Sequence, residues 1–169
     1  MAVEIREASP VDVEQLKSIF MGNLQTNPSY ISHGEVQMGV GELRFEEGDL
    51  HGYIAPNGFD MWEKYIREKI EGNDAVVYIA ESDGRVAGFC VADIEEDGAD
   101  PFGMVCDVLV LPESRGGGVG SMLLDVAISW LRSKGIKDIY LESGKDNHAA
   151  HEYFERRGFY HVSNIYKLG

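Results

Sequence analysis

Cysteine, basic residues and long apolar runs are all scarce in this chain. Its two cysteines, Cys90 and Cys106, form no metal-ligand spacing, so we expect no metal site and free buried thiols in a reducing compartment. The longest apolar stretches have the length of a strand, which excludes a membrane-spanning helix. The first residues also lack the apolar core of a secretory signal. We therefore expect a cytoplasmic protein with no membrane partner.

Lysine and arginine number 15 against 29 aspartates and glutamates, which gives a formal net charge of −14. This balance argues against a nucleic-acid partner, because nucleic-acid binding needs a basic face. A negative field attracts cations, so a cationic amine substrate fits the charge. An acidic surface also confers solubility, and both interpretations remain open.

The length and the hydrophobic content are those of one globular domain. With 169 residues, 44% of them hydrophobic, the chain can bury a core without disulfides or metal ions. We therefore expect a single domain over residues 1–169.

Alternating apolar residues, helical spacing and turn residues predict an α/β domain. Residues 22–58 show no periodicity and are expected to form a long functional loop. The strands near residues 104–111 and 136–142 should form a parallel pair, joined by a crossover helix. Further strands are expected at residues 3–7, 75–81, 85–93 and 159–167, with a hairpin at Asp83-Gly84. Helices are expected after Ser9-Pro10, around residues 59–70, at residues 118–133 with Gly135 as the C-cap, and at residues 147–157.

A glycine-rich junction at residues 115–120 is the most informative segment. It lies between a β-branched run that ends at Pro112 and a helix that begins near Ser121. Glycines leave the backbone N–H groups uncovered, and the N-terminus of the next helix adds its unpaired donors and positive dipole end. The junction therefore predicts a phosphate or pyrophosphate site, with a flexible glycine turn as the alternative.

The spacing of this junction decides between phosphate ligands. A Walker loop would end in Gly-Lys-Ser/Thr, but Gly120 is followed by Ser121 and Met122, which disfavours a nucleotide-binding switch. A dinucleotide-binding loop should open the first βα unit of a chain, whereas this one comes two-thirds of the way along. The pattern that fits is Arg/Gln-x-x-Gly-x-Gly/Ala, which Arg115, Gly118 and Gly120 fill.

This pattern resembles the coenzyme A pyrophosphate loop of the GNAT superfamily of acyl-CoA-dependent N-acyltransferases. A second segment, Asn147-x-x-Ala150 followed by Gly158-Phe159, is similar to another motif of that family and has its intervals. The preceding run into Pro112 and Glu113 is similar to the family's entry to the loop. The resemblance is close from Cys106 to Phe159.

The resemblance implies a fold, an activity and a set of cofactor contacts. The fold would be α/β, with a mixed, mostly antiparallel sheet, a splayed parallel central pair and helices on both faces. The activity would be N-acetyl transfer from acetyl-CoA to a primary amine of a small molecule or peptide, by direct attack in a ternary complex. The oligomeric state stays open, a homodimer included. The cofactor contacts would be Val108, Leu109, Val110, Arg115, Gly116, Gly117, Gly118, Val119, Gly120, Ser121, Asn147, Ala150 and Phe154.

The chemistry needs a base, because an aliphatic amine with a pKa of about 10 is mostly protonated at neutral pH. Asp107 is the first candidate, since it directly precedes the backbone that would contact the cofactor. A backbone N–H among residues 108–110 would polarise the thioester oxygen. The alternative for Asp107 is a solvated or capping carboxylate. Glu35, Glu42 and Glu46 are further candidates for the base.

The acid is where the chain departs from the resembled family. The family usually has tyrosine four residues before the glycine of Gly-Phe, whereas this chain has Phe154 there and Tyr153 one place earlier. Neighbours on a helix point about 100° apart, so we expect Tyr153 to be a packing residue, with the role of the acid as the alternative. His151 is a possible replacement, and so are Tyr30 and Tyr53, with a surface role as the alternative for His151. An altered acid beside intact cofactor motifs would also fit a non-catalytic module that senses acyl-CoA.

Overall fold

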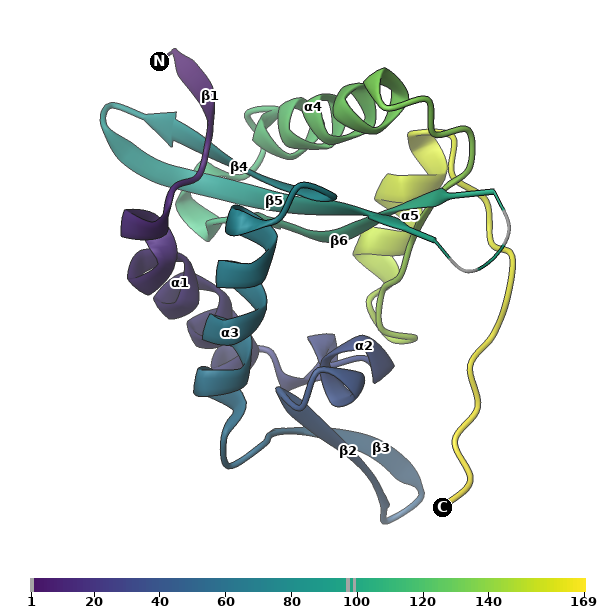
Figure 1. Ribbon diagram of the computed structural model, residues 1–169. Coiled ribbons are helices and arrows are strands. Elements are labelled where there is room, and N and C mark those ends of the chain that lie inside the picture. The colour runs from purple at the N-terminus through teal and green to yellow at the C-terminus, as the bar shows by residue number, and fades with distance from the viewer. Residues whose placement is uncertain (1, 97, 99) are drawn as a thin grey trace. The chain divides into compact units, whose positions relative to one another are not determined.

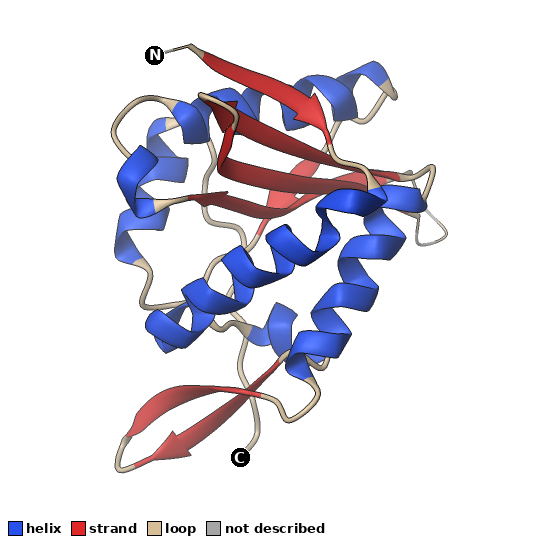
Figure 2. Ribbon diagram, turned by 90° about the vertical axis from the view of Figure 1, so that its left-hand side faces the viewer, coloured by secondary structure: helices blue, strands red, loops and turns tan. Residues whose placement is uncertain are grey.

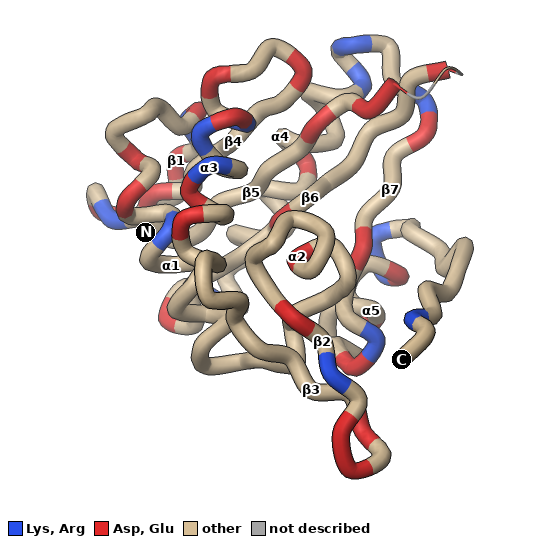
Figure 3. Tube along the Cα trace, turned by 60° about the horizontal axis from the view of Figure 1, so that its bottom comes forward, with Lys and Arg blue, Asp and Glu red and all other residues tan. Residues whose placement is uncertain are grey.

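The computed structural model describes residues 2–96, 98 and 100–169. Met1, with which the expected domain begins, lies outside them. The chain divides into two compact units. The first comprises Met1–Phe20 and Glu63–Glu142, and the second comprises Met21–Trp62 and Ser143–Gly169. Acidic residues lie on most elements of both units (Figure 3). No helix in the described part of the chain is long and apolar enough to cross a membrane.

The first unit is built on a five-stranded sheet (Figures 1 and 2). Neighbouring strands run antiparallel except the last two, which are parallel. This confirms the predicted mixed sheet with one parallel pair, but the pair lies at the edge of the sheet and not at its centre as predicted. The strands, in spatial order, are β1 (Val3–Glu7), β4 (Ala75–Ser82), β5 (Arg85–Glu95), β6 (Phe102–Val110) and β7 (Ile139–Leu141).

The centre of this sheet follows from β-branched residues and one tight turn. β4 and β5 are rich in valine and isoleucine, which favour the extended backbone, and most of their residues are buried. Asp83 and Gly84 join them with φ angles of 52° and 74°, the positive pair that a two-residue hairpin turn requires. The predicted hairpin is therefore confirmed.

Helix α4 (Val119–Ser133) packs on β4, β5 and β6 and lies on one face of the sheet in Figure 1. Its buried residues recur at helical spacing, as in Leu123, Leu124, Ala127 and Leu131. A Cβ on Gly103 of β6 would lie 2.8 Å from the Leu131 side chain, so a larger residue there would require Leu131 to shift. The helix begins one residue after its predicted start and ends where predicted, and Gly135 follows it with a φ of 82°.

The start of the chain is fixed by one buried carboxylate. β1 runs into a short 3₁₀ turn, Pro10–Asp12, which leads into α1 (Val13–Thr26). The backbone N–H of Ser9 donates to Asp12 Oδ2 at 2.8 Å. The guanidinium of Arg6 donates to both carboxylate oxygens of Asp12 at 2.9 Å and to Glu81 of β4 at 2.8 Å. These bonds tie β1 to its neighbours.

Asp12→Asn should destabilise the protein most where Asp12 is ionised. The hydrogen bonds from Arg6 hold the pKa of Asp12 below its usual range. The stabilisation is therefore present above the unfolded-state pKa and is lost as the pH falls through the folded-state pKa. We expect urea denaturation to show a loss of about 1 kcal/mol at neutral pH and a smaller loss at acid pH. Glu4→Gln, at an exposed position of β1, is the control, and an equal loss for Asp12→Asn at both pH values would contradict this explanation.

The second unit contains a β-hairpin that the sequence did not predict. Residues 22–58 were expected to be a long loop, and this prediction is wrong for most of the segment. Glu47 and Gly48, with φ angles of 53° and 81°, make the hairpin turn, although Glu-Gly is not among the common turn pairs. The segment forms the end of α1, a 3₁₀ turn at Pro28–Tyr30, α2 (His33–Gln37), β2 (Gly41–Glu46), β3 (Asp49–Ile54) and the start of α3 (Gly58–Glu71).

Two glycines of this hairpin serve close packing. A Cβ on Gly52 would lie 2.4 Å from the carbonyl oxygen of Pro28, and one on Gly41 would lie 2.7 Å from the Ile31 side chain. Both glycines looked like loop residues in the sequence. They instead let β2 and β3 approach the 3₁₀ turn and the residue that follows it.

The predicted strand at residues 159–167 is also wrong. After α5 (His148–Arg156) the chain has no regular secondary structure, and Tyr160 and Tyr166 are 82% and 89% exposed. The apolar residues there have the composition of a strand, but a strand forms only against a hydrogen-bonding partner. β7 is likewise shorter than the predicted residues 136–142.

Candidate functional site

The predicted phosphate loop lies between β6 and α4, as expected. A short 3₁₀ turn, Pro112–Ser114, leads into it. Gly116 and Gly118 have φ angles of 84° and 83°, which side-chain-bearing residues rarely adopt. A Cβ on either would meet nothing within 4 Å, and one on Gly117 would meet only the Ser114 carbonyl oxygen at 3.9 Å. The backbone of the loop is thus uncovered by the chain around it.

The start of α4 adds hydrogen-bond donors to this loop. Gly118 is the N-cap, and its carbonyl oxygen accepts from the backbone N–H of Met122 at 3.0 Å. By helix geometry the N–H groups of the first turn, which include those of Val119 and Gly120, have no acceptor within the helix. The first turn of α4, all of which the structure describes, contains no acidic residue. The positive end of the helix dipole therefore has no carboxylate from its own first turn beside it.

Arg115 is exposed and held against the end of β6. Its Nε donates to the carbonyl oxygen of Val110 at 3.1 Å. This bond closes the loop across five residues and leaves the positive charge at the surface beside the glycines. Arg115, the loop backbone and the N-terminus of α4 form a set of donors suited to a phosphate.

The parallel pair separates close to its start. β7 pairs with β6 only at residues 103–105 in the part of the chain that the structure describes. Where β6 pairs with β5, Val105 lies opposite Ala92 and Asp107 lies opposite Val91. Cys106 is therefore an extra, bulged residue. Beyond the bulge, the β7-facing edge of Val108, Leu109 and Val110 lies past the end of the parallel ladder. These residues are thus placed where an added extended ligand could pair with them.

Asp107 follows the bulge directly and has a partner that the sequence did not indicate. The hydroxyl of Tyr65 on α3 donates to Asp107 Oδ2 at 2.9 Å. Burial raises the pKa of Tyr65 well above its ordinary value, and the charge of Asp107 adds to this, so the hydroxyl remains a donor. Tyr65 lies on α3 between the buried positions Trp62 and Ile66, and a tyrosine hydroxyl in such surroundings needs a polar partner. This requirement was the feature of the sequence that could have indicated a contact for Tyr65.

Both cysteines are free, and both are poor nucleophiles where they lie. Burial raises the pKa of Cys90 to about 12. Burial also raises the pKa of Cys106, helped by the charges of Asp93 and Asp107. A thiol reacts as its thiolate, so neither group is activated at neutral pH.

The predicted residues of the second unit make mainly structural contacts. Asn147 is the N-cap of α5, and its side-chain oxygen accepts from Ala150 N at 3.3 Å, as asparagine commonly does. The Nε2 of His151 lies 2.9 Å from the carbonyl oxygen of Gly144. This contact fits a structural role for His151, as in the surface alternative, better than the role of an acid.

Tyr153 and Phe154 are both half-buried and lie edge to face, with ring centroids 5.4 Å apart. Phe154 makes a second edge-to-face contact with Phe159, at 5.9 Å. Such pairs stabilise packing. The position that the resembled family gives to its acid is thus filled here by a packed phenylalanine.

The further candidates for base and acid also have local partners within the second unit. Glu35 accepts from the backbone N–H of Ser32 at 2.9 Å and so closes the start of α2. Glu46 accepts from the hydroxyl of Tyr53 at 2.8 Å, which raises the pKa of that tyrosine. Glu42 forms an ion pair with Arg44 at 2.7 Å.

Comparison with known proteins gives consistent results. Residues 42–159 match the model of the acetyltransferase (GNAT) family. A mycothiol acetyltransferase of Streptomyces griseus is 34% identical over 82 residues, which are 48% of this chain and 26% of that protein. The chain therefore spans about a quarter of the length of that relative.

Solved structures show the same fold at low identity. A protein of Clostridium acetobutylicum, described as a predicted acetyltransferase and solved with acetyl-CoA, aligns with a TM-score of 0.70 at 18% identity, over 99% of this chain and 96% of that one. An aminoglycoside N-acetyltransferase solved with CoA aligns with a TM-score of 0.69 at 18% identity, over 99% of this chain and 94% of that one.

Proposed function

Since this chain belongs to the acetyltransferase (GNAT) family, we propose that it transfers the acetyl group of acetyl-CoA to a primary amine of a small molecule or peptide. The observation that carries this proposal is the loop at residues 115–120. It places an uncovered glycine backbone, one arginine and a helix N-terminus directly after a strand whose parallel ladder has ended.

The residues present fit a coenzyme A group. The N–H groups of Gly116, Gly117, Gly118, Val119 and Gly120 would hold the pyrophosphate, and the missing Cβ atoms leave room for it. Arg115 would add the positive charge, with Ser121 next to the loop. The strand edge at Val108, Leu109 and Val110 would pair with the amide groups of pantetheine. Asn147, Ala150 and Phe154 stay proposed cofactor contacts on the resemblance alone.

Asp107 is proposed as the base. Tyr65 fixes one of its carboxylate oxygens at 2.9 Å and so orients the carboxylate. As the nitrogen–acetyl bond forms, the acetyl–sulfur bond breaks, the amine proton passes to Asp107 and sulfur leaves as the thiolate. A backbone N–H among residues 108–110 would stabilise the charge on the thioester oxygen.

A dedicated acid is not required in this proposal. A thiol has a pKa of ~8.5, so the thiolate leaves without full proton transfer more easily than an alkoxide would. Water, His151 or a tyrosine can protonate it afterwards. The packed Phe154 and Tyr153 pair is compatible with this mechanism.

Tyr153→Phe should leave kcat nearly unchanged, because we assign Tyr153 to packing. Phe154→Tyr should leave kcat equal or raise it, because it restores the hydroxyl that the family usually has at this position. General acid catalysis is worth about 10²–10⁴-fold, so a steady-state assay has room to decide. A loss of that size in Tyr153→Phe, with unchanged affinity for acetyl-CoA, would instead make Tyr153 the acid.

The competing function is a module that binds acyl-CoA without turnover, and the altered acid position is the observation that favours it. A panel of polyamines, aminoglycosides, amino acids and peptide N-termini, assayed for acetyl-CoA consumption, separates the two. We expect at least one cationic amine to be acetylated, since the net charge of −14 attracts such acceptors. Tight acetyl-CoA binding without consumption by any class of amine would support the sensing module.

A further inference from the structure

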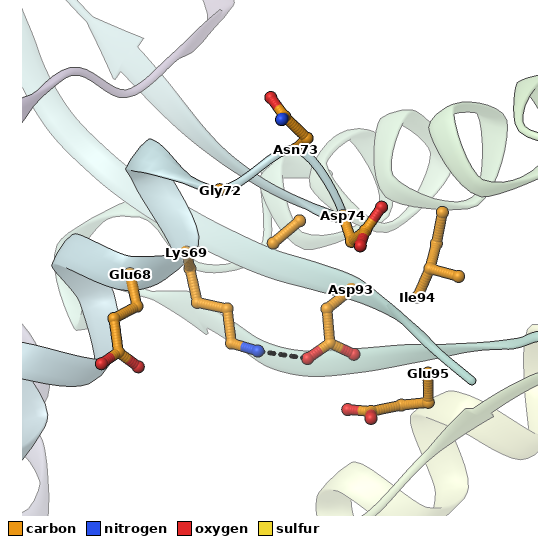
Figure 4. Close-up of a pocket in the computed structure, with 9 residues that line it drawn as sticks. Glu68, Lys69, Gly72, Asn73, Asp74, Asp93, Ile94 and Glu95 are labelled. Carbon is orange, nitrogen blue, oxygen red and sulfur yellow. Dashed lines mark hydrogen bonds and ion pairs between the residues drawn. The ribbon is translucent and has the colours of Figure 1, made fainter. Parts of the chain in front are cut away.

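The first unit contains a pocket of about 250 Å³ at the edge of its sheet (Figure 4). The end of α3, the start of β4 and the end of β5 surround it. Its charged lining residues are Glu68, Lys69, Asp74, Asp93 and Glu95. The lining thus holds four carboxylates and a single ammonium group. None of these residues belongs to the proposed acetyl-transfer machinery.

One of these carboxylates has an unused acceptor. Asp93 is only 5% exposed, and its Oδ2 forms an ion pair with Lys69. Its other oxygen, Oδ1, is buried and has no hydrogen-bond partner among the described residues. Figure 4 shows Asp93 among the residues that line the pocket, with Lys69 on one side of its carboxylate. A buried acceptor without a donor is costly, so a donor brought by a ligand would be favourable there.

The charges around Asp93 also favour a positively charged ligand. Burial is the largest single influence and lowers the pKa of Lys69, but the hydrogen bond with Asp93 and the nearby negative charges together outweigh it, so the net pKa is raised and Lys69 stays an ammonium group. The negative charge of Asp93 raises the pKa of the exposed Glu95. The single charge of Lys69 therefore does not neutralise the carboxylates, and the electrostatic potential at this end of the pocket is negative.

The chemistry of the lining favours an organic cation. Among the described residues no group of three or more histidines, cysteines, aspartates and glutamates is placed to hold a metal ion. An alkylammonium group needs only acceptor oxygens around its three N–H donors. We propose that this pocket binds an alkylammonium group, with Asp93 Oδ1 as its buried acceptor and Glu68 and Glu95 as the surrounding charges.

The pocket lies close to Asp107 within the first unit. Asp107 pairs with Val91 of β5, two residues before Asp93, and their partners Tyr65 and Lys69 are one helical turn apart on α3. Two sources of the ammonium group therefore fit: the second amine of a diamine acceptor, or a separate effector. The first source rests on the proposed acetyl transfer, whereas binding itself does not.

Calorimetry on the full chain without acetyl-CoA tests the binding, with 1,4-diaminobutane as the probe. The double variant Glu68→Gln/Glu95→Gln should weaken binding about fivefold or more, because it removes two charges of the pocket. The matched control, Glu71→Gln/Glu96→Gln, removes two exposed charges that do not line the pocket and should change binding less than about twofold.

Asp93→Asn should abolish measurable binding, provided that circular dichroism shows it folded. The double variant keeps the buried ion pair between Asp93 and Lys69. Its calorimetry therefore tests the binding site if Asp93→Asn does not fold. Absence of binding to the parent protein, or equal weakening in the double variant and its control, would overturn the proposal.

Kinetics with this diamine and with butylamine, a monoamine of the same chain length, then identify the source of the ammonium group. If the diamine is an acceptor, the double variant weakens its apparent binding in the steady state and leaves the kinetics of the monoamine unchanged. If the diamine is an effector, its addition changes the acetylation of butylamine in the parent protein and not in the variant. If no amine is acetylated, the proposed function fails while the calorimetric result still decides the binding site.

Discussion

Gly117→Val is expected to raise the Kd for acetyl-CoA about 100-fold while the protein remains folded. Gly117 has no positive φ, and a side chain there would meet only the Ser114 carbonyl oxygen at 3.9 Å. The folded chain therefore tolerates the side chain, but a pyrophosphate lying on the loop does not. Hydrogen bonds to charged groups contribute about 1.5–3 kcal/mol each, so the loss of one or two accounts for the expected change. Calorimetry with acetyl-CoA measures it.

A second glycine gives this experiment a matched control. Gly118 and Gly135 stand at opposite ends of α4 with φ angles of 83° and 82°, and a Cβ on either meets nothing within 4 Å. Alanine at either position therefore carries a similar backbone strain. Gly118→Ala should weaken acetyl-CoA binding, and Gly135→Ala should only lower stability. Unchanged affinity in Gly117→Val and in Gly118→Ala would remove this loop from the cofactor site.

Asp107→Asn is expected to lower kcat/KM by about 10²–10⁴-fold, the usual contribution of a general base. Asparagine can still accept the hydrogen bond from Tyr65, so the local structure should persist. The loss should be largest at low pH, where most of the amine is protonated, and should shrink as the pH approaches the amine pKa of about 10. A pH profile of kcat/KM measures this dependence.

Two controls accompany the Asp107 variant. The Kd for acetyl-CoA should stay at the parent value, since Asp107 is assigned to the amine rather than to the cofactor. Tyr65→Phe removes the 2.9 Å hydrogen bond but keeps the base, so its loss of kcat/KM should be smaller. A profile of Asp107→Asn that superimposes on that of the parent would make Asp107 a structural carboxylate.

The glycine loop and the start of α4 could be predicted because local backbone constraints determine them. Gly116 and Gly118 need positive φ angles, and the N-terminus of α4 follows them directly, so a short stretch of sequence holds the information. The Asp83-Gly84 turn was predictable for the same reason.

The missed features depend on partners that are distant in the sequence. The β2–β3 hairpin needs Gly41 and Gly52 to pack against Pro28 and Ile31, and those glycines alone indicated a loop. Residues 159–167 have strand-like composition without a pairing partner. Tyr65 and Asp107 are 42 residues apart in the chain, so only the fold shows their contact.

The central claim is that acetyl transfer to the amine is direct, and release of free thiol after rapid mixing tests it most directly. The protein is mixed with acetyl-CoA in the absence of amine, and the amine is added second. Because both cysteine thiols have raised pKa values, we expect no thiol release before the amine is added, and release equal to the acetylated amine afterwards. Release of about one thiol per chain before the amine is added would show an acetylated protein intermediate and would contradict the account.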